Sequence, residues 1–176
     1  MIIKNWYALA EAVILSLALI YLLGRIVRTL LYRRRQQKLF KEYALQRGYE
    51  LKIILNSELR EIVGGLNPSL SMSIPGIMWN KAGFNGWLLE FTYLTGMPRL
   101  GFRPQHANAC IVLNPRRTQP IKTEKNIADY MEVLRKKLNV EKVGFLESGA
   151  IYTEPVLTSQ KELDMIIDAS IEINSN

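Results

Sequence analysis

Residues 6–24, near the amino terminus, form an apolar run with one side chain that is charged at neutral pH, Glu11, and no proline. Because a helix rises 1.5 Å per residue, this run spans roughly the 30 Å hydrocarbon core of a bilayer. A buried helix of a soluble protein seldom runs this long without a polar face. A cleavable signal peptide fits poorly, because only Lys4 precedes the run and a basic segment follows it. The sequence therefore predicts a membrane-spanning helix over residues 6–24.

The basic residues on the two sides of this run predict its orientation. One lysine precedes it, whereas six basic residues follow closely and form a membrane flank: Arg25, Arg28, Arg33, Arg34, Arg35 and Lys38. By the positive-inside rule, residues 1–5 are expected outside and the remainder in the cytoplasm, at an inner or plasma membrane. Between Gly24 and Gly48 no helix-ending residue appears, so residues 25–47 are predicted to continue as a basic helical stalk.

The net charge of +7 belongs to this flank. Residues 1–47 hold nine Lys and Arg against two Glu, and residues 48–176 hold fourteen basic and fourteen acidic side chains. The excess charge therefore indicates a membrane surface and argues against nucleic acid as a partner. The single cysteine, Cys110, excludes an intrachain disulfide and agrees with a reducing compartment.

Small residues define one possible contact face within the span. Ala8, Ala12 and Ser16 are spaced by four and share a helical face with Glu11. The preferred interpretation of Glu11 is an interfacial glutamate near the outer headgroups. The alternative is a packing face for another membrane protein or for a second copy of the chain.

Residues 48–176 are predicted to form one small domain in which strands precede helices. Tyr49, Leu51, Ile53 and Leu55 lie on one side of the stretch 49–55, with Glu50 and Lys52 opposite, which predicts a half-buried strand whose apolar face is turned to the core. A short helix is expected over 58–63. Residues 64–123 hold six of the seven prolines and no helical period, which favours strands and loops.

The later elements follow from equally local patterns. The stretch 87–93 alternates as a strand, with a partner before it and a turn containing Gly83, Asn85 and Gly86, and 109–113 reads as a central strand. Helical stripes are predicted at Ile127, Tyr130, Met131, Leu134 and Leu138, and, after a capping box of Ser159 and Glu162, at Leu163, Ile166, Ile167 and Ile171. A hairpin turning at Ser148 and Gly149 is expected between them. The predicted fold class is α+β: a transmembrane helix continuing into a stalk, then a mainly antiparallel sheet with two or three helices on one face.

No pattern of catalytic, cofactor-binding or metal-binding residues emerges. The glycines of 63–69 lack the lysine of a phosphate-binding loop, and Pro68 interrupts a helix start. His106 and Cys110 face the same side of a strand, which would suit a thiol and its base, but a buried inert cysteine is the preferred interpretation. Glu132, Asp164, Asp168 and Glu172 are interpreted as solvated carboxylates on helix faces. We therefore expect a non-enzymatic protein without a cofactor.

A basic segment, residues 91–123, contains no acidic residue, whereas residues 147–176 carry a net charge of −5. The basic side chains of segment 91–123 are Arg99, Arg103, Arg116, Arg117 and Lys122. Beside anionic headgroups, each would contribute roughly 1 kcal/mol. Protein contact is preferred over lipid contact here, and nucleic-acid stacking on Phe91, Tyr93 or Phe102 ranks last.

Taken together, these patterns favour a single-pass membrane protein that acts as an accessory subunit or assembly factor of a membrane complex through its cytoplasmic domain. Its expected partners are membrane lipids and another membrane protein or a second copy. An anionic-lipid-binding module is the first alternative, and a membrane-bound hydrolase of unrecognised type is the second.

Overall fold

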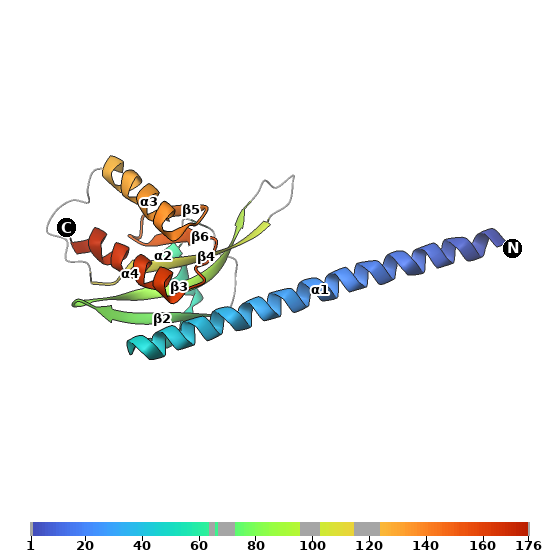
Figure 1. Ribbon diagram of the computed structural model, residues 1–176, viewed down its shortest axis with the longest axis horizontal. Helices are drawn as coiled ribbons and strands as arrows, with labels where there is room; N and C mark the ends of the chain where they lie inside the picture. The colour runs from blue at the N-terminus through green and yellow to red at the C-terminus, as the bar shows by residue number, and fades with distance from the viewer. Residues whose placement is uncertain (1, 64–65, 67–72, 96–102, 115–123, 176) are drawn as a thin grey trace. The chain divides into compact units, whose positions relative to one another are not determined.

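The structure is a computed structural model that describes residues 2–63, 66, 73–95, 103–114 and 124–175. Its elements in order are α1 (Ile2–Arg47), β1 (Glu50–Leu55), α2 (Asn56–Val63), β2 (Ser73–Lys81), β3 (Phe84–Thr95), β4 (Arg103–Val112), α3 (Glu124–Leu138), β5 (Lys142–Phe145), β6 (Ile151–Glu154) and α4 (Gln160–Ser175) (Figure 1). The chain divides into two compact units, residues 1–38 and 39–176. The predicted α+β class is confirmed.

Helix α1 is long and apolar enough to cross a membrane by length and composition. It ends where the sequence predicts, because Gly48 adopts the left-handed conformation with φ 67°. The Tyr49 N–H donates to the Ala44 carbonyl at 2.8 Å, and the Gly48 N–H donates to the Leu45 carbonyl at 3.4 Å. These two bonds form a Schellman motif, which satisfies carbonyls that the helix end leaves without partners.

The six strands that the structure describes form one antiparallel sheet in the order β1-β2-β3-β4-β6-β5, so β1 and β5 are the edges of this set. The β2–β3 hairpin turns at Ala82 and Gly83, both with positive φ, as a two-residue turn matched to the strand twist requires. Asn85 and Gly86, expected in this turn, already lie in β3. The predicted central strand is β4, which pairs with β3 and β6.

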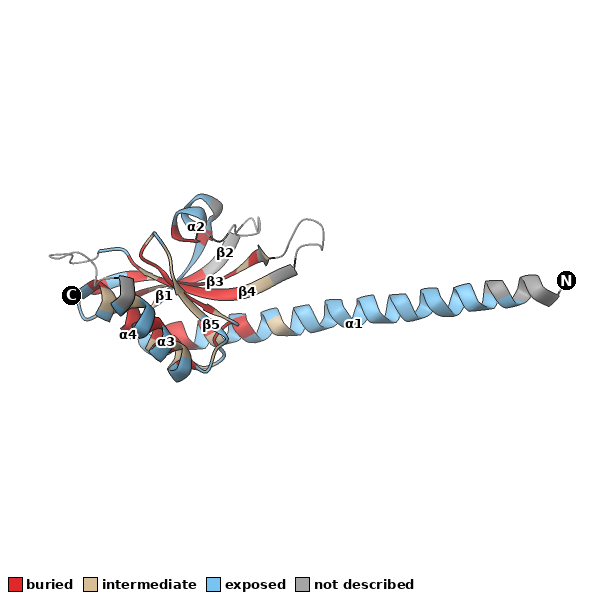
Figure 2. Ribbon diagram, turned by 90° about the horizontal axis from the view of Figure 1, so that it is seen from above, coloured by how far each residue is buried: buried red, intermediate tan, exposed pale blue. Residues whose placement is uncertain are grey.

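Helices cover both faces of the sheet in residues 39–176, whereas the sequence predicted one covered face. Helices α3 and α4 lie on one face and α2 lies on the other (Figure 2). Leu59, Ile62 and Val63 of α2 belong to the same buried cluster as alternating side chains of β3, among them Phe91 and Tyr93. Helix α2 has only eight residues, and so short a pattern does not reveal which face of the sheet the helix covers.

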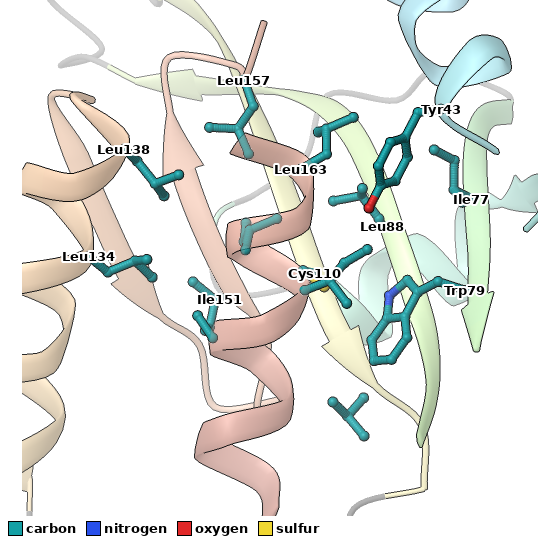
Figure 3. Close-up of a cluster of buried hydrophobic side chains, with 14 of the residues drawn as sticks. Tyr43, Ile77, Trp79, Leu88, Cys110, Leu134, Leu138, Ile151, Leu157 and Leu163 are labelled. Atoms are coloured by element: carbon teal, nitrogen blue, oxygen red, sulfur yellow. The ribbon is translucent and has the colours of Figure 1, made fainter. Parts of the chain in front are cut away.

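The larger core lies under α3, α4 and residues 39–47 of α1. These nine residues, which the sequence pattern assigned to the stalk, place Phe40, Tyr43 and Ala44 in the core. Figure 3 shows Tyr43 and Trp79 beside α4, with Cys110 between that helix and the strands. The stripe predicted for α4 is buried at Leu163, Ile166 and Ile167, whereas Ile171 is half-buried. That of α3 is buried at Met131, Leu134 and Leu138 and half-buried at Ile127 and Tyr130.

Strand β1 exposes the face that the sequence predicted to be buried. Leu51, Ile53 and Leu55 are 41%, 69% and 59% exposed, and Ile54, on the opposite face, is fully buried. Ile54 belongs to the cluster formed with Leu59 of α2. The alternation was predicted correctly but its direction was wrong, because β1 is an edge strand whose covering helix lies on the Ile54 side.

The amino end of α4 has the predicted capping box. The Glu162 N–H donates to Ser159 Oγ at 3.3 Å, and the Ser159 N–H donates to Glu162 Oε2 at 2.9 Å. The two residues thus satisfy each other's backbone donors. The helix therefore begins at a fixed position, which sets the register of the carboxylates farther along it.

Candidate functional site

Asp164 of α4 joins the end of α1 to the rest of the domain through two donors. Tyr43 Oη donates to Asp164 Oδ1 at 2.8 Å, and the Arg47 guanidinium donates to Asp164 Oδ2 in an ion pair. The Asp164 side chain is 22% exposed, so the carboxylate is half-buried. We call these three residues the α1–α4 clamp. The expectation that Asp164 is a solvated carboxylate is wrong, because a partner 121 residues earlier in sequence covers it.

Burial and the carboxylate both act on the Tyr43 hydroxyl. Burial raises the pKa of Tyr43 far above its ordinary value near 10, and the hydrogen bond to Asp164 raises this pKa further. The separate hydrogen bond from Arg47 to Asp164 raises the pKa of Arg47. Tyr43 therefore stays protonated at every physiological pH, as a donor must. The arrangement is suited to holding two helices together.

Two further carboxylates follow Asp164 at intervals of four on α4. Asp168 accepts from Lys81 Nζ of β2 at 2.5 Å, and Glu172 accepts from Tyr130 Oη of α3 at 2.7 Å. Burial raises the pKa of Tyr130, and Glu172 adds to this effect. Both carboxylates are exposed, as expected, but each contacts a named donor. One face of α4 thus contacts α1, β2 and α3 in turn.

Cys110 and His106 both lie in β4, but their environments differ. Cys110 is fully buried beside α4 (Figure 3), and burial raises the pKa of its thiol to about 12. His106 is half-buried, with Nδ1 3.1 Å from Thr92 Oγ1. Since the thiolate is the nucleophilic form, a protonated core thiol is a poor nucleophile. The burial predicted for Cys110 is confirmed.

Other titratable groups in the described ranges also contact one another. Tyr93 Oη donates to Glu154 Oε2 at 2.5 Å, and Lys142 lies 5.4 Å from the centre of the Tyr152 ring. On α3, the hydrogen bond from Arg135 lowers the pKa of Glu132 to about 2. Among the residues that the structure describes, no group of three or more His, Cys, Asp or Glu is arranged to hold a metal ion.

The edge of β1 is the apolar surface that we take as the candidate interface. It comprises the exposed side chains of Leu51, Ile53 and Leu55 and the outer backbone of the strand. Its opposite face carries Glu50 and Lys52, whose charged atoms lie 3.0 Å apart. Sequence reasoning found the alternation but missed the interface, because only the strand order shows that β1 is an edge.

The residues predicted to flank and pack within the span all lie on α1. Arg25, Arg28, Arg33, Arg34, Arg35 and Lys38 are exposed, as are Glu11, Ala12 and Ser16. Ser16 Oγ donates to the Ala12 carbonyl at 2.8 Å, so the hydroxyl is satisfied within the helix. The Ala8 side chain lies outside the described parts of the structure.

Most of the predicted basic segment lies outside the described residues. This holds for Arg99, Arg116, Arg117, Lys122 and Phe102, and for the side chain of Arg103 at the start of β4. The two described aromatic residues of this segment, Phe91 and Tyr93, are 1% and 4% exposed. Their rings stack with the ring centres 5.8 Å apart. They are part of the core and do not form a platform for bases.

Comparison with models of protein families, with curated proteins and with solved structures finds no match.

Proposed function

We propose that this chain is a single-pass membrane protein whose domain contacts other membrane proteins, as an accessory subunit or assembly factor. In this proposal α1 crosses the bilayer, residues 1–5 lie outside, and the domain lies in the cytoplasm. The apolar composition of the span and the six basic residues that follow it support this orientation. The role itself is non-enzymatic.

The observation that carries the proposal is the continuity between α1 and the domain core. Helix α1 runs from Ile2 to Arg47 without interruption, and its last turns place Phe40, Tyr43 and Ala44 in the core. The clamp to Asp164 adds polar contacts at the same end. A domain joined in this way needs no separate linker, which suits contact with a neighbour in the same membrane.

The described titratable groups support a role in contacts over a role in catalysis. Asp164, Asp168 and Glu172 hold elements of the fold together, and Cys110 is a core residue. In contrast, the edge of β1 leaves three large apolar side chains exposed on one face. Contiguous apolar surface of this kind often marks a protein contact.

The orientation can be tested with single cysteines, because buried Cys110 provides a silent background. We expect Asn5→Cys to react with a membrane-impermeant thiol reagent in intact cells. The matched variant Glu141→Cys, on an exposed residue of the domain, should react only after the membrane is opened. Labelling of Glu141→Cys in intact cells, with protection of Asn5→Cys, would reverse the proposed topology.

The accessory role can be tested by purifying the full chain from native membranes in mild detergent and identifying co-purifying proteins by mass spectrometry. We expect a distinct membrane protein in stoichiometric amount. The control is a chain of unrelated sequence with a single span, expressed at the same level. Recovery of this chain without a distinct partner under several mild detergents would refute the accessory role.

A further inference from the structure

Strand β1 lies at the edge of the described sheet and carries few of the features that usually protect an edge. It pairs with β2 through Glu50–Leu55 and, among the strands that the structure describes, has no second neighbour. Its sequence, ELKIIL, contains no proline or glycine and only two charges, which are of opposite sign. Natural edge strands usually carry prolines, bulges or several charges that prevent pairing with another chain. This strand is therefore open to pairing.

The backbone donors of Leu51 and Ile53 point away from β2. Successive residues of an antiparallel strand direct their N–H and C=O groups alternately toward and away from a given neighbour. Tyr49 and Leu55 are an even number of residues from Leu51 and Ile53, so their N–H groups point to the same side of the strand. The Tyr49 N–H donates to the Ala44 carbonyl and the Leu55 N–H donates to Glu58 Oε2, and neither acceptor belongs to β2. Leu51 and Ile53 therefore present their backbone N–H and C=O groups at the open edge.

The charges of β1 complement those of a second, antiparallel copy in one register. With a two-fold axis at Leu51, Glu50 lies opposite Lys52 of the other copy, and Lys52 lies opposite its Glu50. Moving the axis to Lys52 places two lysines opposite each other, and moving it to Ile53 places Lys52 opposite the buried Ile54. Opposite charges across an antiparallel pair are stabilising and like charges are destabilising. Charge complementarity thus selects the first register.

We propose that the edge of β1 pairs with β1 of a second copy of this chain, antiparallel, about a two-fold axis at Leu51. The paired Leu51 residues exchange backbone hydrogen bonds, and Ile53 donates to the Tyr49 carbonyl of the other copy. The Tyr49 N–H, already bound to Ala44, stays in its helix cap. Such a contact uses the same surface on both copies, as two-fold dimers do. The pairing goes beyond the proposed accessory role and does not depend on it.

Disulfide formation in native membranes tests the register directly. A hydrogen-bonded antiparallel pair has its Cα atoms about 5.5 Å apart, within the range that a disulfide spans. We therefore expect Leu51→Cys to give a cross-linked dimer under mild oxidation. The matched controls are Ile53→Cys and Leu55→Cys, whose copies would lie roughly 13 Å and 26 Å apart along the strands. All three sites are exposed, and Cys110 is buried.

The expected result is a yield of cross-linked dimer about tenfold higher for Leu51→Cys than for either control, since only this site meets the disulfide distance. Equal yields at the three sites, or a higher yield at Ile53→Cys, would overturn the assignment. Absence of a cross-link at all three sites would also overturn it, provided that each cysteine reacts with a thiol reagent and so is shown to be accessible.

Charge reversal separates contact between copies from the ion pair within one strand. In the Leu51→Cys chain, Glu50→Lys alone places lysine opposite lysine, and Lys52→Glu alone places glutamate opposite glutamate. Each change should reduce the homodimer cross-link. Co-expression of the two variants with different tags should restore a cross-link between them, because only the mixed pair has opposite charges at both positions. The ion pair within each strand stays broken, so restoration supports pairing between copies.

Failure of the mixed pair to cross-link above either single variant would refute the charge register. Glu50 and Lys52 are both exposed, so the reversals leave the core unchanged. A distinct protein that co-purifies without a Leu51→Cys cross-link would leave the accessory role standing and remove the pairing. A Leu51→Cys cross-link without a distinct co-purifying protein would support the pairing and remove the accessory role.

Discussion

The clamp between Tyr43 and Asp164 predicts a measurable coupling within the domain. Tyr43→Phe keeps the buried ring and removes the hydroxyl that donates to the carboxylate at 2.8 Å. A hydrogen bond to a charged group contributes about 1.5–3 kcal/mol. Asp164 keeps its contact with Arg47 and is partly exposed, so the expected loss lies at or just below the low end of this range, about 1–1.5 kcal/mol. Asp164→Ala should cost more, about 2 kcal/mol, because it leaves the Tyr43 hydroxyl without its acceptor.

The assay is chemical unfolding of the full chain in mild detergent, followed by tryptophan fluorescence. Trp79 is fully buried in the same core as Tyr43, so its emission reports the unfolding of this domain. The double variant should cost little more than Asp164→Ala, which gives a coupling free energy of about 1 kcal/mol in a double-mutant cycle. Additive losses, or a neutral Tyr43→Phe, would refute the reasoning.

The same pair predicts a dependence of stability on pH. The pKa of Tyr43 is raised in the folded chain, so above pH 10 the unfolded chain loses a proton that the folded chain retains. Stability should therefore be complete below about pH 10 and fall as the pH rises through the alkaline range. Tyr43→Phe removes one such proton, which should reduce the slope by about 1.4 kcal/mol per pH unit. An unchanged slope would contradict the raised pKa.

Three other predictions concern the core and a helix cap. Gly86→Ala should destabilise the domain by more than about 2 kcal/mol, because the added Cβ would meet the Ile111 carbonyl at 2.0 Å and the Trp79 ring. The control Gly24→Ala has open space in a helix, where alanine is favoured, and should not destabilise the chain in the same assay. The Cys110 thiol, with a pKa of about 12, should react with a soluble disulfide reagent only upon denaturation, so rapid reaction of the folded chain would contradict its burial. Ser159→Ala should cost about 1 kcal/mol through loss of the α4 cap, measured against Ser57→Ala, an exposed control.

Sequence patterns predicted the helices and strands of this fold better than the contacts between them. The end of α1 at Gly48 and the cap at Ser159 and Glu162 were predictable, because each depends on residues a few positions apart. The partnership of Tyr43 with Asp164 was not, because it joins residues 121 positions apart. A local pattern shows that Asp164 lies on a helix but does not reveal what packs against that helix.

The error at β1 has a related cause. A period of two assigns Leu51, Ile53 and Leu55 to one face, but it does not say whether anything covers that face. Coverage depended on α2, which packs against Ile54, and on the position of β1 at the edge of the sheet. The candidate interface therefore became visible only with the strand order.

The order of synthesis gives the packing of α1 against α4 a consequence for the newly made chain. Phe40, Tyr43 and Ala44 are translated early, yet the helix that covers them is the last element of the domain. At 5–20 residues per second, about ten seconds separate Tyr43 from Asp164. During that interval the end of α1 remains without its native cover, so a chaperone or a neighbouring chain has time to reach it before the ribosome completes α4.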